Sequence, residues 1–128
     1  MMEISGVVQS GAGKGAYFTQ LEWVVKQCKR ILGYQPFPGT LNVRVVDEDL
    51  PGLSRFLQDA DLELIPDDPS FCAARVKKVM VNQIPAALVL PGKDVRIHEN
   101  RVIELMASCN LKNSLGLKDG DRITVFSV

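Results

Sequence analysis

The chain carries one long helical segment among six or seven short strand-like segments, and this imbalance restricts the folds open to it. Strand-like alternation or short apolar runs occur at residues 3–9, 40–46, 62–65, 71–81, 85–90, 102–107 and 122–128. An alternating α/β sheet requires a helix between most of its strands, and this sequence does not supply those helices. We therefore expect a mainly β protein, a small β-barrel with α-helices packed on its outside.

The long helical segment covers residues 19–32, and its ends carry clear signals. The residues TQLE match a capping box, in which the Thr19 hydroxyl and the Glu22 carboxylate satisfy free backbone amides of the first turn. One apolar face follows at helical spacing, formed by Leu21, Val24, Val25, Cys28, Ile31 and Leu32. Lys29 and Arg30 suit the negative end of the helix dipole, and Gly33 is a natural C-terminal stop.

Two shorter helical segments and one turn complete the expected elements. The residues PGLSRFLQDA predict a short helix, and NLKNSLG predicts a helical turn. Near the end of the chain, Asp119-Gly120 is a turn signal that leads into a closing strand. Because no repeat or linker interrupts the pattern, we expect residues 1–128 to form a single domain, as the length also indicates.

Charge and hydropathy exclude several classes of protein. The 15 basic and 15 acidic residues give a formal net charge of zero, and we interpret the adjacent pairs Lys29-Arg30 and Lys77-Lys78 as solvated surface. Binding nucleic acid mainly by electrostatics needs a clustered basic excess, so we expect no nucleic-acid partner. No apolar run approaches the ~20 residues of a membrane helix, and the N-terminus lacks the regions of a signal peptide. We expect neither a membrane association nor a protein partner.

The cysteines indicate the expected compartment. Cys28, Cys72 and Cys109 are odd in number and far apart, which matches neither a disulfide framework nor a metal-ligand spacing. Their neighbours are apolar, so we expect buried structural thiols in a reducing cytoplasm. The single histidine, His98, cannot form a metal site alone.

A glycine-rich segment, SGAGKGAYF at residues 10–18, separates the first strand from the long helix. It is not a Walker loop, because its lysine precedes the last glycine. Gly11, Gly13 and Ala16 fit the Rossmann spacing, but the third small residue of that motif lies inside a helix, which we expect here only from Thr19, and further βαβ units are missing. Alternating glycines let backbone amides approach an anion closely, and Lys14 adds a point charge. A plain glycine-rich barrel turn with an exposed lysine is the alternative.

A second candidate site lies on the strand at residues 40–46. Thr40 and Asn42 are two residues apart and therefore project to the same face of the strand. A hydroxyl and a carboxamide oxygen are hard ligands that suit Mg²⁺. The alternative is that both side chains simply face solvent.

Three motifs in this order and spacing resemble the archaeal-type CTP-dependent riboflavin kinases. They are GAGKGAYF, then LGYQPFPGTLNVRV, then IELMA followed by NLKNSLGLKDGD. The similarity covers nearly the whole chain, and PFPGTLN together with the upstream glycine segment is its most specific part. The resemblance implies a compact six-stranded Greek-key barrel of the cradle-loop type. It also implies transfer of the γ-phosphate of CTP to the 5′-hydroxyl of riboflavin, giving FMN and CDP.

The resemblance also implies a role for particular residues. The phosphates of the nucleotide would be bound by Gly11, Ala12, Gly13, Lys14, Gly15 and Ala16. The nucleotide pocket would include Cys109, Asn110, Leu111 and Lys112. Thr40 and Asn42 would ligate one Mg²⁺ that bridges the phosphates. Glu104 would contact the flavin and orient its hydroxyl, and no residue stands out as a catalytic base.

Some positions depart from the family pattern. Arg96 stands where the family has a flavin-contacting threonine, Ser108 where it has a proline, and Asn113 where it has a glutamate. Residues 47–81 match only loosely. Because these departures cluster on the flavin side, one alternative is a homologous module that binds nucleotide or flavin without efficient transfer. A second alternative is a cradle-loop DNA-binding barrel, which the net neutrality and the intact GTLN motif disfavour.

Overall fold

The structure is a computed structural model that describes residues 2–11, 14–70, 73–91 and 101–128. Its elements are β1 (Glu3–Gln9), α1 (Lys14–Phe18), α2 (Glu22–Ile31), β2 (Leu41–Val45), η1 (Asp47–Asp49), α3 (Leu50–Leu57), β3 (Leu62–Leu64), β4 (Ala74–Val81), β5 (Ile84–Pro91), β6 (Val102–Ala107), α5 (Leu111–Ser114) and β7 (Arg122–Ser127). Each strand expected from the sequence is present, with ends that differ by a few residues. The short helix and the helical turn are also present, as α3 and α5.

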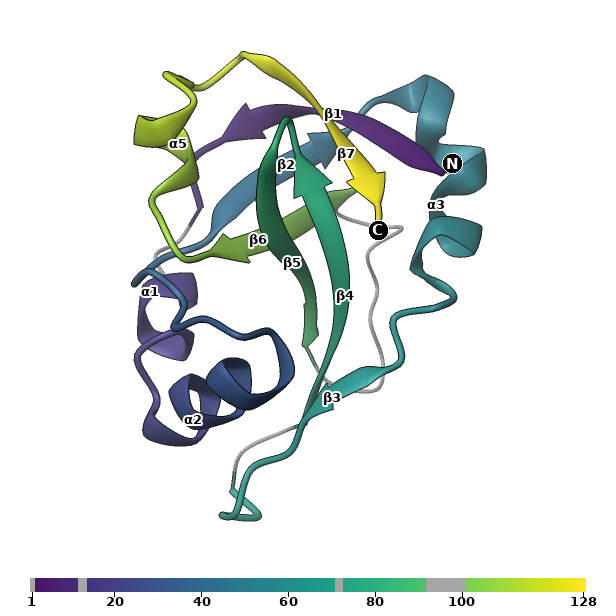
Figure 1. Ribbon diagram of the computed structural model, residues 1–128. Helices are drawn as coiled ribbons and strands as arrows, with labels where there is room; N and C mark the ends of the chain where they lie inside the picture. The colour runs from purple at the N-terminus through teal and green to yellow at the C-terminus, as the bar shows by residue number, and fades with distance from the viewer. Residues whose placement is uncertain (1, 12–13, 71–72, 92–100) are drawn as a thin grey trace.

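Six of the strands close into an antiparallel barrel (Figure 1). Neighbours around the barrel run β1, β2, β6, β5, β4 and β7, and β7 pairs back onto β1. One edge of β4 is shared, because its first half pairs with β3 and its second half with β7. The expected six-stranded barrel is therefore confirmed, with β3 as an added edge strand.

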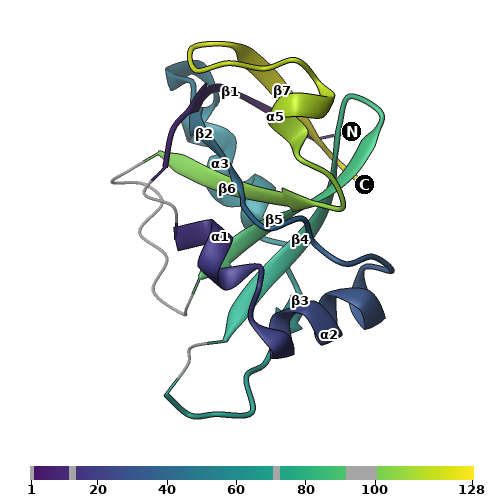
Figure 2. The ribbon, with the colours of Figure 1, turned by 90° about the vertical axis from the view of Figure 1, so that its left-hand side faces the viewer.

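Side chains that alternate along the strands form two apolar layers. The inner layer fills the barrel with residues such as Val43, Leu88 and Leu105, and α3 adds Leu53 and Phe56. The outer layer lies between α2 and the outside of β3–β6, where Val24 and Cys28 pack on residues including Val76, Ala87, Val89 and Met106. Figure 2 shows α1 and α2 together on this side of the barrel. The helices thus cover one outer face of the barrel, as the apolar face of the long helix predicts.

Cys28 and the end of α2 agree with the sequence analysis, whereas Cys109 differs from the expected buried thiol. Cys28 is buried, and desolvation raises the pKa of its thiol to about 11, as expected for an inert structural cysteine. Gly33 ends the helix with a φ of 85°. Cys109 is half-buried, and Cys72 and His98 lie outside the described residues.

The predicted capping box is wrong. Helix α2 begins at Glu22, and Leu21 precedes it without a side-chain cap. Thr19 is instead buried, where its hydroxyl donates to the carbonyl of Gly15 at 2.7 Å and accepts from the amide of Gly39 at 2.8 Å. The Glu22 carboxylate faces Lys26 at 3.4 Å rather than the helix start. The local pattern predicted that the Thr19 hydroxyl caps the helix, but this hydroxyl bonds to Gly15 and Gly39 instead.

The residues before Thr19 form a short helix that the sequence analysis did not predict. Helix α1 covers Lys14–Phe18, so Ala16 does lie in a helix. The sequence analysis argued against a Rossmann motif partly because it expected no helix at Ala16, and that argument is wrong. The topology still excludes that fold, because every strand pair of the described sheet is antiparallel and no βαβ unit occurs in it.

The expectation that Lys77 and Lys78 are both solvated is wrong for Lys77. Lys78 is exposed, but Lys77 is only 4% exposed because strand alternation directs it to the inner side of β4. Its ammonium lies 4.7 Å from the centre of the Phe56 ring and pairs with the carboxylate of Asp59. The hydrogen bond from Lys77 lowers the pKa of Asp59. The buried charge is thus compensated at the end of the barrel that α3 covers.

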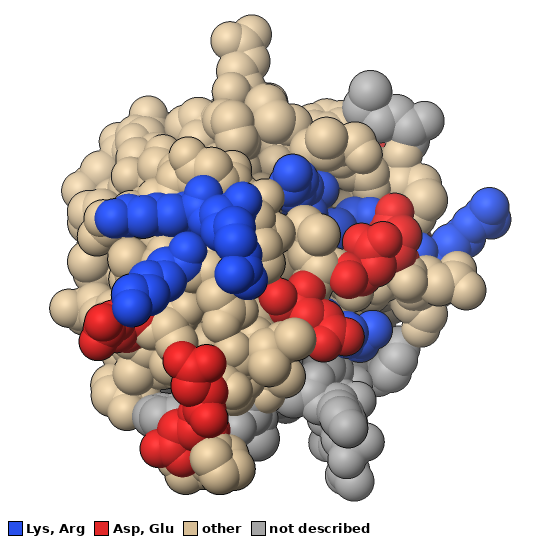
Figure 3. Space-filling view, turned by 60° about the horizontal axis from the view of Figure 1, so that its bottom comes forward, with Lys and Arg blue, Asp and Glu red and all other residues tan. Residues whose placement is uncertain are grey.

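Surface charge is mixed on the face drawn in Figure 3, where basic and acidic side chains lie beside one another. This pattern agrees with the formal net charge of zero. Among the described residues, no helix combines the length and the apolar character that crossing a membrane requires.

Replacing Thr19 with valine tests the buried hydroxyl. Valine keeps the shape but leaves the Gly39 amide without its acceptor, so we expect the free energy of unfolding to fall by ~1–3 kcal/mol. Urea denaturation followed by circular dichroism measures this change. Thr19→Ser, which keeps the hydroxyl, is the matched control and should lose less. Equal stability of Thr19→Val and the wild type would contradict the assignment.

Candidate functional site

Three polar side chains form a row on the outer face of β2 and β6. Thr40 directly precedes β2, and its hydroxyl donates to a carboxylate oxygen of Glu104 at 3.1 Å. Asn42 is the register partner of Glu104 across the β2–β6 ladder, so the two side chains project to the same side. All three are half-buried. We call Thr40, Asn42 and Glu104 the polar row.

The strand positions this row because its two faces differ. Leu41, Val43 and Val45 point inward and are buried in the barrel core. The residues between them must then point outward, which is the alternation that the sequence predicted. Thr40 is also anchored from its N-terminal side, because the Phe37 amide donates to the carbonyl of Ala107 at 2.7 Å. The polar row therefore rests on rigid, buried backbone.

Gly11 and Gly15 of the glycine segment, residues 11–16, lie directly against the polar row. A Cβ on Gly11 would come within 2.2 Å of the Asn42 amide nitrogen, and a Cβ on Gly15 within 2.0 Å of the Thr40 hydroxyl oxygen. Only a residue without a side chain permits such a close approach. The two glycines are thus needed for contact with the candidate metal ligands.

The structure describes part of the predicted phosphate-binding segment. Gly11, Gly15 and Ala16 are described, while Ala12 and Gly13 lie outside the described residues, and the Lys14 side chain is not described. Thr19 holds the segment in place, because its hydroxyl joins the Gly15 carbonyl to the Gly39 amide, one residue before Thr40.

A pocket of about 140 Å³ opens beside Thr40. It is lined by Phe37, Pro38, Gly39, Thr40, Leu41, Leu105, Ala107, Cys109, Asn110, Leu111 and Lys112. All four residues predicted for a nucleotide pocket, 109–112, are in this lining. Sequence reasoning missed Phe37, a 39% exposed aromatic side chain, although it lies inside the PFPGT motif.

A second, shallower hollow of about 340 Å³ lies further along β2. Its lining includes Gln9, the register partner of Asn42, and Arg44, which follows Asn42 on the same face. Arg101 and Asp47, which form an ion pair, also line it. Asn42 therefore lies between the pocket and this hollow. Arg96, the other predicted flavin contact, lies outside the described residues.

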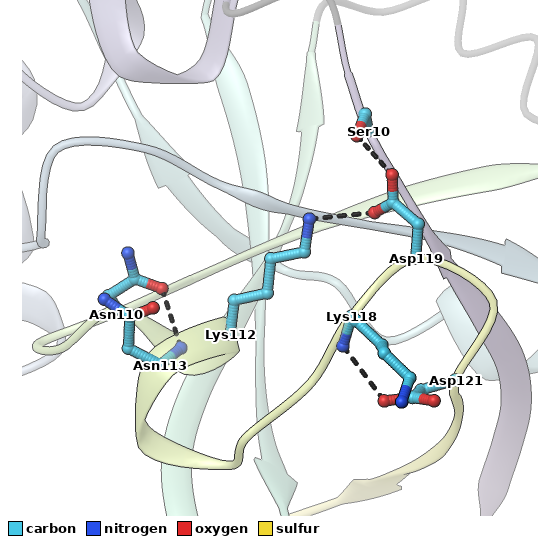
Figure 4. A network of polar contacts seen from close by, with 7 residues as sticks. All are labelled: Ser10, Asn110, Lys112, Asn113, Lys118, Asp119 and Asp121. Atoms are coloured by element: carbon cyan, nitrogen blue, oxygen red, sulfur yellow. Dashed lines mark hydrogen bonds and ion pairs between the residues drawn. The ribbon is translucent and has the colours of Figure 1, made fainter.

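Helix α5 and the turn after it form a polar network with the residue before the glycine segment (Figure 4). The Lys112 ammonium lies 2.8 Å from one carboxylate oxygen of Asp119, and the Ser10 hydroxyl donates to the other. The hydrogen bonds from Lys112 and Ser10 lower the pKa of Asp119. The Asn110 side chain caps α5 by accepting from the Asn113 amide at 3.1 Å. Sequence reasoning treated the LKDGD residues only as a turn and so missed Asp119 and Ser10.

The polar row suits a hard cation such as Mg²⁺. Among the described residues, no group of three or more histidine, cysteine, aspartate or glutamate side chains lies together. A hydroxyl, a carboxamide and one carboxylate instead converge on the outer face of β2 and β6. Mg²⁺ is often bound through one or two protein oxygens, with phosphates and waters completing its shell. The donor set of the row fits that mode.

Comparisons with known proteins find matches over nearly the whole chain. Residues 8–126 match the family model labelled CTP-dependent riboflavin kinase, whose description reads domain of unknown function DUF120. A riboflavin kinase of Methanobrevibacter smithii is 34% identical over 124 residues, which cover 97% of this chain and 98% of that protein. Riboflavin kinases of Saccharolobus solfataricus and Methanoregula boonei are 33% and 34% identical, and the matches span 73% and 55% of their lengths.

The match with the family model spans nearly the whole barrel, and the M. smithii relative is covered almost completely. The matched range includes the glycine segment and the strand of the polar row, and Gly11 and Gly15 of that segment lie against Asn42 and Thr40. The chain therefore belongs to the CTP-dependent riboflavin kinase family, a family of phosphotransferases.

Proposed function

We propose that residues 1–128 form one barrel domain that transfers the γ-phosphate of CTP to the 5′-hydroxyl of riboflavin. The products are FMN and CDP. The observation that carries the proposal is the contact of the glycine segment with Thr40 and Asn42, beside a pocket lined by residues 109–112. This contact supports the proposal, because it would bring backbone that binds phosphate and oxygens that bind the metal to one place. The relatives named riboflavin kinase support the choice of acceptor.

The nucleotide extends from the pocket to the glycine segment in this proposal. The base enters the pocket, where Phe37 offers an aromatic surface and residues 109–112 offer backbone groups. The triphosphate then runs along residues 11–16, where backbone amides and the Lys14 charge face it. Thr40 lines the pocket and touches Gly15, so it stands at the junction of the two parts.

One Mg²⁺ held by Thr40 and Asn42 would bridge the phosphates and neutralise charge that develops during transfer. Glu104 supports this arrangement by accepting the hydrogen bond of the Thr40 hydroxyl, which leaves the lone pairs of that oxygen free. The protein residues orient the reactants, and this positioning provides much of the catalysis in phosphoryl transfer.

In the proposal, riboflavin is the phosphate acceptor and lies on the side of Asn42 that faces away from the nucleotide pocket. In-line transfer requires the attacking hydroxyl to approach opposite the leaving CDP. The hollow lined by Gln9 and Arg44 is on that side, and Glu104 faces the same outer surface. The riboflavin oxygen forms a bond to the γ-phosphorus, the bond from that phosphorus to the β–γ bridging oxygen breaks and leaves this oxygen on CDP, and the hydroxyl proton passes to solvent. Arg96 would adjoin the flavin at the position where the family has threonine.

A module that binds nucleotide or flavin without efficient transfer is the competing hypothesis, because Arg96, Ser108 and Asn113 depart from the family pattern. Asn113 is exposed on α5, where its amide is capped by Asn110. Small molecules are the only partners that the proposal requires, and the mixed surface charge in Figure 3 offers no argument for nucleic acid.

A product assay with the four nucleoside triphosphates, riboflavin and Mg²⁺ tests the proposed function. We expect efficient FMN formation with CTP, poor use of UTP, and least use of ATP and GTP. Each mismatched buried polar group costs ~1–3 kcal/mol, so a few mismatches give a preference of about 100-fold or more. Chromatography with fluorescence detection measures FMN. Equal rates with ATP and CTP would contradict the proposal, and CTP binding without FMN formation would favour the binding module.

Replacing Asn42 with alanine tests the metal site. Removal of a metal ligand should lower turnover by about 100-fold or more, because the charge on the transferring phosphate is then poorly neutralised. The melting temperature should change little, since the Asn42 side chain points out of the core. Asn42→Asp keeps an oxygen ligand and should retain more activity than Asn42→Ala. Wild-type rates in Asn42→Ala would remove Asn42 from the metal site.

Replacing Gly15 with alanine tests the close contact with Thr40. A Cβ at this position must push the segment away from the Thr40 hydroxyl, and a displacement of about 1 Å can cost about 100-fold in rate. Gly52→Ala is the matched control, because nothing lies within 4 Å of its added Cβ and α3 favours alanine. The control should keep full activity. If both variants are equally active, the contact has no role in turnover.

A further inference from the structure

Asp119 connects the two segments that hold the nucleotide in the proposed function, although it lines neither cavity. It lies in the turn between α5 and β7, and its two carboxylate oxygens have different partners. One oxygen faces the ammonium of Lys112, the last residue of the pocket lining, at 2.8 Å. The other accepts from the hydroxyl of Ser10, directly before Gly11. Figure 4 shows the carboxylate between these two side chains.

Lys112 needs such a partner to remain at the site. A lysine side chain has a flexible four-carbon stem and a strongly hydrated head, so an unpaired ammonium on the surface samples many positions. The Lys112 side chain is 37% exposed and extends from the short helix α5 toward Asp119. With Asp119 in place, the ammonium stays near Ser10 and therefore near the start of the glycine segment. Ser10 in turn keeps the carboxylate oriented, because it occupies the second oxygen.

We propose that Asp119 is a positioning residue for the nucleotide, which holds the Lys112 ammonium where the phosphates of a nucleoside triphosphate meet the glycine segment. This role rests on the proposed function. The triphosphate carries more negative charge than the Asp119 carboxylate. The Lys112 ammonium is therefore shared between Asp119 and the incoming phosphates, and it does not return to solvent. Asp119 acts through Lys112 and contacts no reacting atom.

The pair persists under the conditions in which a kinase is assayed. Hydrogen bonds from Lys112 and Ser10 lower the pKa of Asp119, so its carboxylate is ionised at neutral pH. The ion pair would be lost only when the pH falls through that lowered pKa. A second carboxylate of the same turn, Asp121, has a different role, because it accepts from the Lys118 backbone amide at 2.9 Å.

Asp119→Asn and its matched control Asp121→Asn test the proposal. Each removes one negative charge from the same turn, and both positions accept asparagine with little change in shape. Steady-state kinetics are measured with CTP and riboflavin varied in turn. We expect Asp119→Asn to raise the KM for CTP by at least about threefold, while kcat and the KM for riboflavin stay within about twofold. Asp121→Asn should leave all three constants unchanged. An unchanged KM for CTP in Asp119→Asn, or an equal rise in both variants, would overturn the proposal.

A double-mutant cycle with Lys112→Met separates positioning from general stabilisation. If Asp119 acts through the lysine, Asp119→Asn adds no further rise in the KM for CTP once Lys112 is methionine. Additive effects would overturn the proposal.

Calorimetry of CDP binding to the same four proteins separates failure of the proposed function from failure of the positioning role. It is needed if the wild type forms no FMN, in which case the proposed function fails. The positioning role then stands only if Asp119→Asn weakens CDP binding and this effect disappears in the Lys112→Met background. A wild type that binds no CDP overturns both.

Discussion

The backbone of the glycine segment lies against Thr40 and Asn42, and the arrangement of the site depends on this contact. The added Cβ atoms at Gly11 and Gly15 would fall 2.2 and 2.0 Å from those two side chains, so the distance between segment and strand is set by the absence of side chains. A metal ion bound to hard oxygens and an anion bound to amides must be near neighbours for phosphoryl transfer. In this protein Asn42 and Thr40 leave no room for a Cβ at Gly11 and Gly15, so the proposed metal and phosphate sites would be near neighbours.

The barrel makes that contact possible because β2 has two different faces. Its inward residues are fixed in a core that also receives Leu53 and Phe56 from α3. Its outward residues are therefore supported from behind, and the cross-strand register places Glu104 beside them, where it accepts the hydrogen bond of Thr40. Densely packed interiors resist small displacements, which suits a site that must hold reactants in line. The polar row is rigid since the core behind it is well packed.

Sequence patterns predicted the strands and the outward side of Thr40 and Asn42, but not the place of Glu104 beside them or the contacts that hold the segments together. Alternation along residues 40–46 is a local property, and it correctly separated buried residues from outward ones. The capping box at Thr19 is also a local pattern, yet the hydroxyl bonds to Gly15 and to Gly39, which is 20 residues away. Lys77 shows a related limit, because strand alternation directs it inward but its buried charge is compensated by Phe56 and Asp59, which are not its neighbours in sequence. Local patterns fail where a distant partner offers a better interaction.

The link between Ser10 and Asp119 shows how a distant pair becomes predictable only through topology. The two residues are 109 positions apart, and the local signals around them, a glycine-rich segment and an Asp-Gly turn, do not indicate that they meet. The β1–β7 ladder pairs Val7 with Arg122, and the Val8 backbone continues the pairing to Asp121 and Gly120. This extension brings the turn before β7 beside the end of β1, where the glycine segment begins. Because β7 also pairs with β4, the strand that closes the barrel is the one that positions this turn. Barrel closure thus contributes to the geometry of the proposed nucleotide site as well as to the stability of the fold.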